Sequence, residues 1–145
     1  MPMILNKNAK REYEISDTVV AGVMLTGAEV KSLREGRGSL RDAYARLLNG
    51  ELFLVGADIP KYTHYSGKEY DAKRSRKLLL NKNELLKLQQ KLEGKALALV
   101  PLRLFFQGRW VKCELGVGRG KKEYEKREDL KKRDQEREIA RAMKN

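Results

Sequence analysis

The side chains best suited to chemistry in this chain are basic groups and tyrosines gathered between Lys61 and Lys91. That stretch holds 9 Lys or Arg against 3 Asp or Glu, interleaved with Tyr62, Tyr65 and Tyr70. Basic groups neutralise phosphates, and aromatic faces stack on unpaired bases. A solvated loop with locally packed tyrosines is the alternative, but the clustering favours a nucleic-acid interface.

Residues suited to covalent or metal chemistry are few and wrongly spaced. His64 and Cys113 are the single histidine and cysteine of the sequence, which excludes a zinc-ligand spacing. The serines lack a Gly-x-Ser-x-Gly context, and GRGKKE at 118–123 lacks both the P-loop spacing and its Ser or Thr. We therefore expect no catalytic residue, no metal and no cofactor. A small nuclease with His64 as base stays the enzymatic alternative.

Composition points to a polyanionic partner. The 145 residues carry a formal net charge of +12, which is typical of nucleic-acid-binding domains. A single cysteine forbids an internal disulfide and indicates a reducing environment. The sequence shows no signal-peptide pattern and no apolar run of membrane-spanning length. We expect a soluble, cytoplasmic, monomeric protein with no membrane partner.

The elements that must position these residues are short strands and two helices. Thr26 with Glu29 has capping-box spacing before a helix over 28–35, whose polar side, including Glu29, is expected to face solvent. Asn81 and Glu84 start a second helix that ends at Gly94. Apolar runs predict strands at 13–15, 19–25, 44–48, 51–59, 95–106 and 109–118, with a hairpin turn at Asn49-Gly50, a bulge or edge at Pro101 and a long exposed loop over 60–77.

These elements predict an α+β, mainly β fold, which we interpret as a small OB-like closed β-barrel with flanking helices and a charged C-terminal tail. Residues 1–12 form a basic N-terminal arm and residues 13–119 the barrel. The tail, residues 120–145, contains 10 Lys or Arg and 7 Asp or Glu but almost no apolar face. Such a segment is expected to be disordered when free and helical in a polyanionic groove.

Four segments resemble the SmpB family, the SsrA-binding proteins, in order and at this length. They are NKNAKREYEI (6–15), GAEVKSLREG (27–36), RSRKLLLNKNEL (74–85) and GVGRGKKEYEKRE (116–128). The resemblance implies an OB-like barrel that binds the tRNA-like domain of transfer-messenger RNA. It further implies delivery of that RNA to stalled ribosomes, where the tail enters the decoding centre and mRNA channel of the small subunit. It implies no catalytic activity.

The resemblance also assigns residues. Leu79 and Asn81 match RNA-contacting positions of the family, although they could also be a core leucine and a helix N-cap. Together with the basic loop, they predict a surface that binds the tRNA-like domain. Its residues are Lys7, Arg74, Arg76, Lys77, Leu79 and Asn81. The ribosome-binding residues expected in the tail are Lys121, Lys122, Tyr124, Lys126, Arg127 and Met143.

Three positions depart from the family pattern. Val20 stands where glutamate is common, YDAKR at Tyr70–Arg74 replaces a His-Asp-Pro-x-Arg-like loop, and Ala142-Met143 replaces a larger apolar pair. A general structured-RNA-binding protein, or a ribosomal protein whose tail threads into rRNA, is the alternative function.

Overall fold

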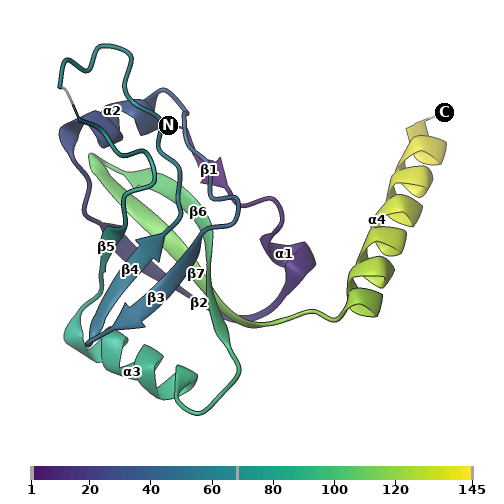
Figure 1. Cartoon of the computed structure of the whole chain (residues 1–145). Coiled ribbons are helices and arrows are strands. Elements are labelled where there is room, and N and C mark those ends of the chain that lie inside the picture. Colours follow the sequence, from purple (N-terminus) through teal and green to yellow (C-terminus); the bar gives the residue numbers. More distant parts are fainter. Residues whose placement is uncertain (1, 68, 145) are drawn as a thin grey trace.

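The computed structural model describes residues 2–67 and 69–144, except the side chains of 123–125, 129 and 138–144 in the last helix. Strands dominate, and the helices lie around them (Figure 1). In chain order the elements are β1 (Ile4–Leu5), α1 (Ala9–Glu12), β2 (Tyr13–Val23), α2 (Gly27–Arg34), β3 (Tyr44–Leu48), β4 (Glu51–Val55), β5 (Arg76–Leu79), α3 (Lys82–Leu92), β6 (Ala98–Gln107), β7 (Trp110–Gly120) and α4 (Glu123–Lys144).

The strands pair in the order β1-β6-β3-β4-β5-β2-β7, and β6 also pairs with β7. All of these pairings are antiparallel. The extra pairing makes β6, β3, β4, β5, β2 and β7 a ring of strands. The mainly β architecture is confirmed, whereas the OB-like closed barrel stays a prediction.

Register shifts occur in β2 and β6, two long strands that each pair with more than one neighbour. β2 pairs with β5 at one end and with β7 along its length, and its register shifts between Ile15 and Asp17. β6 pairs with β1, β3 and β7, and its register with β7 shifts between Pro101 and Arg103. Bulges bend a strand and increase its twist, which lets one strand curve between two partners. The bulge predicted at Pro101 is confirmed.

Helices α2 and α3 cover opposite ends of the ring (Figure 1). Each begins with the predicted capping box, Thr26 with Glu29 and Asn81 with Glu84. Their apolar faces reach the core through Leu33, which is 2% exposed, and Leu88, which is 4% exposed. The core also takes side chains from every strand, among them Ile4, Ala21, Ala45, Leu52, Leu54, Leu78, Leu99 and Cys113.

The sequence-based elements are partly right. Asn49 and Gly50 have φ values of 52° and 77°, which confirms the hairpin turn. The strands expected at 13–15 and 19–25 form one strand, β2, and the strand expected to run to Ile59 ends at Val55 before Gly56, whose φ is 80°. The expectation of a loop up to residue 77 was wrong at its end, because β5 begins at Arg76.

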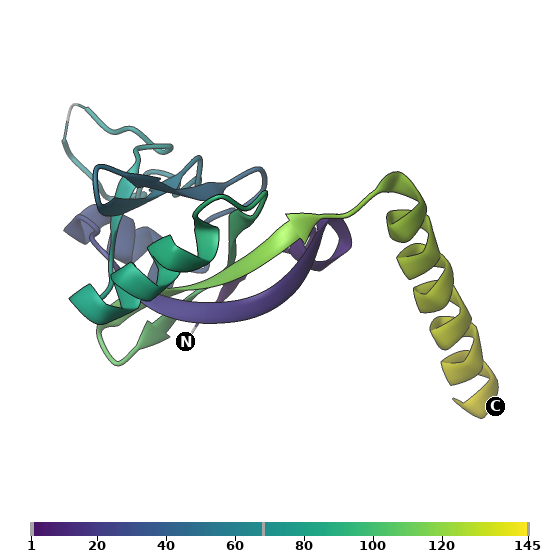
Figure 2. The same ribbon diagram turned by 90° about the horizontal axis from the view of Figure 1, so that it is seen from below.

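Helix α4 projects from the ring beyond the end of β7 and contacts α1 (Figure 2). It is helical over Glu123–Lys144. The expected disorder of this tail in the free protein stays a prediction.

Gly118 allows a close approach between β2 and β7. An added Cβ there would lie 2.3 Å from the main-chain oxygen of Glu14, and main-chain atoms cannot move aside cheaply. We expect Gly118→Ala to lower the free energy of unfolding by about 3 kcal/mol, the upper range for overpacking. Urea denaturation measures it. Gly120→Ala is the matched control, since an added Cβ meets nothing within 4 Å, and equal stabilities of the two variants would contradict the prediction.

Candidate nucleic-acid interface

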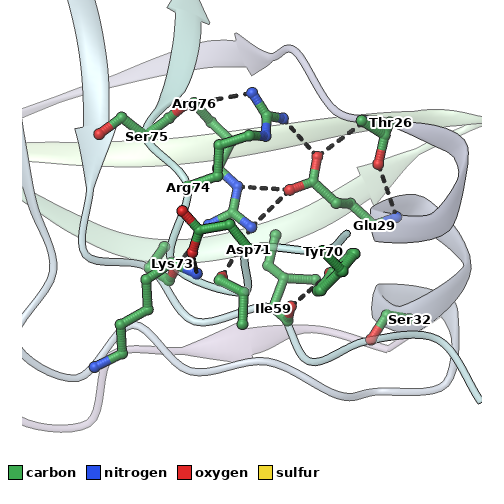
Figure 3. A network of polar contacts seen from close by, with 12 residues as sticks. Thr26, Glu29, Ser32, Ile59, Tyr70, Asp71, Lys73, Arg74, Ser75 and Arg76 are labelled. Atoms are coloured by element: carbon green, nitrogen blue, oxygen red, sulfur yellow. Dashed lines mark hydrogen bonds and ion pairs between the residues drawn. The ribbon is translucent and has the colours of Figure 1, made fainter. Parts of the chain in front are cut away.

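A buried ion-pair network joins α2 to β5 and to the loop before it (Figure 3). The Glu29 carboxylate is 2% exposed and lies 2.6 Å from Nη2 of both Arg74 and Arg76, while Nε of Arg76 donates to it at 2.8 Å. The main-chain N–H of Thr26 donates to the same carboxylate at 2.9 Å. Arg76 is 0% exposed. Its Nη1 donates to the carbonyl of Ala57 and its Nη2 to the carbonyl of Ala72.

Glu29 is ionised in this network. Burial alone would raise the pKa of its carboxyl, but the hydrogen bonds from Arg74, Thr26 and Arg76 and the positive charge of Arg76 together outweigh burial. The pKa of Glu29 therefore lies below its ordinary value of 4.5. A glutamate that the sequence pattern placed on the solvated face of its helix is instead the buried centre of the network, so that expectation was wrong.

The same region holds the basic loop against the body. Tyr70 Oη donates to the carbonyl of Ile59 at 2.6 Å, and Ser32 Oγ donates to that of Pro60 at 2.7 Å. Burial, followed by the charge of Glu29, raises the pKa of Tyr70, which keeps its hydroxyl protonated as a donor. The base of the loop is thus fixed, and the tyrosines Tyr62 and Tyr65 near its tip contact Lys31 and Lys61 respectively through their ring faces.

Arg76 was expected to bind RNA, and its burial corrects that prediction. Alternation along β5 buries Arg76 and Leu78 and turns Lys77 and Leu79 outward. A side chain that is 0% exposed and fully engaged with Glu29, Ala57 and Ala72 cannot reach a phosphate. Its positive charge pairs with the buried carboxylate of Glu29 inside the fold.

Outward side chains of three strands form one row that is suited to RNA. Gly22 pairs with Leu79 of β5 on one side and with Lys112 of β7 on the other. Because Gly22 has no side chain, a Cβ there would lie 3.5 Å from Cβ of Leu79 and 3.8 Å from Nζ of Lys112. Leu79 is 48% exposed although it is apolar. We call Val20, Gly22, Met24, Leu79, Trp110 and Lys112 the β2–β5–β7 face.

A shallow groove of about 400 Å³ runs along this face. It is lined by apolar side chains together with Arg109 and Lys112, and Trp110 at its edge is 63% exposed. The guanidinium of Arg109 lies over the Trp110 ring, 5.2 Å from its centroid. Exposed rings beside cations can stack on bases while the cations bind phosphates. Lys112 and Trp110 were missed from sequence, although alternation in WVKC places Lys112 opposite the buried Cys113.

The structure places the expected RNA-binding residues in different parts of the surface. Leu79 belongs to the β2–β5–β7 face, and Asn81, which is exposed, lies two residues later at the start of α3. Lys77 also points outward but pairs with Glu51, and Arg74 is exposed but held by Glu29. Lys7 lines a different groove, which it shares with Lys121.

Asn81 keeps both of its possible roles. Its side-chain oxygen accepts from the N–H of Glu84 at 2.8 Å, so the cap is confirmed. Its exposure leaves the amide group accessible to a base edge, and contact with RNA stays a prediction.

The tail residues lie at the other side of the body. Lys121 bonds to the N-terminal arm, Lys122 is exposed, and Lys126 and Arg127 lie in the first turns of α4. The side chains of Tyr124 and Met143 lie outside the described residues. Val20, one of the positions where the sequence departs from the resembled pattern, is 43% exposed on the β2–β5–β7 face.

Neither a metal centre nor a membrane span is visible in the described ranges. Among the side chains that the structure describes, no three His, Cys, Asp or Glu gather in a way that could hold a metal ion. No helix within those ranges is both long and apolar enough to cross a membrane.

The sequence matches a family of known proteins. The sequence profile of the SmpB protein family matches residues 3–145. The chain is 51% identical over 137 residues to the SsrA-binding protein of Salinispora arenicola, covering 94% of this chain and 86% of that one. It is 49% identical over 140 residues to the SsrA-binding protein of Microcystis aeruginosa, covering 96% and 91%.

A solved structure is similar over most of its length. It is described as "tmRNA-SmpB: a journey to the center of the bacterial ribosome" and is 44% identical to this chain, with a TM-score of 0.70. The match covers 85% of this chain and 87% of the solved chain.

Glu29→Gln should strongly destabilise the fold, because it leaves Arg76 buried without a counter-charge. Breaking a buried pair costs about 3–5 kcal/mol. Since folding lowers the pKa of Glu29, its contribution is complete above pH 4.5 and is lost as pH falls through the lower folded value. The difference in unfolding free energy between wild type and variant should therefore shrink between neutral and strongly acidic pH.

Glu51→Gln is the matched control for this measurement. Its pair with Lys77 is exposed on both sides, so we expect a loss of about 0–1 kcal/mol. Similar costs for the two substitutions at neutral pH would refute the central role of Glu29.

Proposed function

The chain belongs to the SmpB protein family, and from that premise we propose that it is an RNA-binding adaptor for ribosome rescue. It binds the tRNA-like domain of transfer-messenger RNA and delivers that RNA to stalled ribosomes for trans-translation and peptide tagging. The name SsrA-binding protein of its relatives supports the RNA partner, and the solved tmRNA-SmpB structure supports the ribosomal setting.

The observation that carries the proposal is the row of the exposed Leu79 with the half-buried Gly22 and Lys112, and the exposed Asn81 two residues after Leu79. An exposed leucine has little reason to face water beside a cation and an amide unless a partner covers it. The apolar side chain suits the face of an unstacked base, the ammonium suits a phosphate and the amide suits a base edge. The β2–β5–β7 face is therefore the proposed site for the tRNA-like domain, with Arg74 and Lys77 as flanking cations.

The tail supplies the second half of the proposed function. Its basic residues face the rRNA of the small subunit, and Lys122, Lys126 and Arg127 lie where α4 begins. Tyr124 stacks at the decoding centre and Met143 contacts the mRNA channel. We further propose that the ring of strands is an OB-like closed barrel, and that the protein acts in the cytoplasm as a monomer without cofactor or catalysis of its own.

Substitutions of Lys112 on the β2–β5–β7 face and of Asn81 at the start of α3 should weaken RNA binding without unfolding the protein. Asn81→Ala should cost about 1–3 kcal/mol of affinity for the tRNA-like domain if the amide reads a base. It should also cost about 1 kcal/mol of stability through the lost cap. Lys112→Gln should reduce the slope of log affinity against log salt by about 0.7–0.9, the value for one phosphate.

Lys131→Gln on the tail is the control, because it removes the same charge away from the body. Affinity and salt dependence are measured by filter binding, and melting temperature by circular dichroism. Affinity unchanged by Asn81→Ala and Lys112→Gln would contradict this placement of the site. Equal binding to bulk rRNA and to the tRNA-like domain would favour the general RNA-binding alternative.

Removing residues 123–145 separates the two halves of the function. The ring and Lys121 remain, so affinity for the tRNA-like domain should stay nearly unchanged. Peptide tagging on stalled ribosomes should be lost, because α4 carries the charges that face rRNA. Tagging is measured in a reconstituted translation reaction on an mRNA without a stop codon. Full tagging by the truncated protein would contradict the proposed role of the tail.

A further inference from the structure

The N-terminal arm is fixed to the body just before it reaches the tail. β1 pairs with β6, and Asn6 adds two hydrogen bonds, from its N–H to the carbonyl of Leu102 and from Nδ2 to that of Pro101, both 2.9 Å. Ala9, in the first turn of α1, is only 3% exposed. An arm that appears merely basic in sequence is thus a packed part of the fold.

Lys121 joins this arm to the root of the tail through two separate bonds. Its main-chain N–H donates to the carbonyl of Glu12 at 2.8 Å, which extends the β2–β7 pairing one step beyond Tyr13 and Gly120. Its Nζ donates to the carbonyl of Lys10 at 2.8 Å. The last carbonyls of a helix lack partners within the helix, and a lysine at that end satisfies one of them.

Like charges on the arm and on α4 oppose a close approach of these two segments. The groove between arm and tail is lined by Leu5, Leu102 and mostly basic residues, including Lys7, Lys10 and Arg11 from the arm and Lys132 and Arg133 from α4. Glu114 and Glu136 offset only part of this charge. Since exposed like charges repel, the arm and α4 tend to separate unless hydrogen bonds hold the root of the tail.

We propose that Lys121 is a positioning residue: it fastens α1 to the root of the tail and so fixes the direction in which α4 leaves the ring. This inference rests on the proposed role of the tail in ribosome rescue. It reassigns Lys121 from an rRNA contact to an internal tie, and it leaves Lys122, its exposed neighbour, for the ribosome. Figure 2 shows α1 beside the end of β7, where the chain turns toward α4.

Hydrogen exchange in the free protein tests the tie without RNA or ribosome. The probes are the N–H of Lys121, bonded to Glu12, and the N–H of Glu12, bonded to Asn8 at 3.0 Å. Lys121→Met keeps the length of the side chain but removes the charged donor, so exchange at Glu12 should accelerate by about tenfold, the effect of losing a charged hydrogen bond. Lys122→Met and Lys10→Gln remove the same charge and keep the tie, so both should match wild type.

Tagging activity then tests the consequence through a double-mutant cycle. Lys121→Met and Ala9→Asp both release α1, so the double variant should lose no more tagging activity than the stronger single variant. Asn6→Ala replaces Ala9→Asp if that variant fails to fold. Affinity for the tRNA-like domain should be unchanged throughout, and Lys121→Arg, which keeps a donor, should restore protection and tagging.

The two proposals fail in different ways. Equal exchange in Lys121→Met and Lys122→Met, or additive losses of tagging in the cycle, would overturn the positioning role and return Lys121 to the rRNA-binding residues. A wild-type protein that neither binds the tRNA-like domain nor supports tagging would overturn the proposed function. In that case the exchange measurement still decides whether Lys121 ties the arm to the tail.

Discussion

The arrangement of this molecule depends on one buried carboxylate. Glu29 accepts hydrogen bonds from the main-chain N–H of Thr26, the N-cap of α2, and from the guanidinium groups of Arg74 in the preceding loop and Arg76 at the start of β5. With Arg76 fixed inward, the alternation along β5 is determined, and Leu79 must face outward. A shift of one residue in β5 would turn Leu79 into the core and expose the arginine. The ion pair therefore sets the register on which the proposed RNA-binding face depends.

The composition of that face follows from the same register. Gly22 stands between Leu79 and Lys112, and its missing side chain leaves room for both to approach over the main chain. Val20 lies two residues before Gly22, on the same face of β2, and is exposed. A carboxylate at this position would repel a nearby phosphate, so valine makes the face more apolar and more positive. For the proposed RNA-binding role, this composition suits contact with bases and phosphates better than contact with an RNA hydrogen-bond donor.

Local sequence signals predicted the parts of the fold that depend on neighbouring residues. The capping boxes at Thr26 and Asn81 and the turn at Asn49-Gly50 each need only a few consecutive residues, and all are confirmed. The overall mainly β class followed from the spacing of apolar runs. The short strand β5 was missed because its four residues, RKLL, run into a helix start and become a strand only between β2 and β4.

The candidate site shows the same division. Leu79 and Asn81 could be named from their resemblance to a family motif, whereas the burial of Arg76 could not be predicted from sequence. Its partner Glu29 lies 47 residues away, so pairing depends on the tertiary fold. Charge counting treats every arginine in a basic stretch as equally available, and only packing distinguishes a phosphate ligand from an internal ion pair. Lys112 was missed for the converse reason, since it is the single lysine of β7 and lies outside the basic stretch.

A highly charged helix without an apolar face gains little from its own body. Sequence pairs such as Glu128 with Lys132 stabilise α4 by about 0.2–0.5 kcal/mol each, which leaves a free helix of this length marginal. Its useful energy must come from a polyanion, and binding is then opposed by the loss of conformational freedom at its root. Two hydrogen bonds from Lys121 to α1 remove part of that freedom before the partner is met. In the proposed role, the arm therefore preorganises the tail for binding without itself having to touch the partner of the tail.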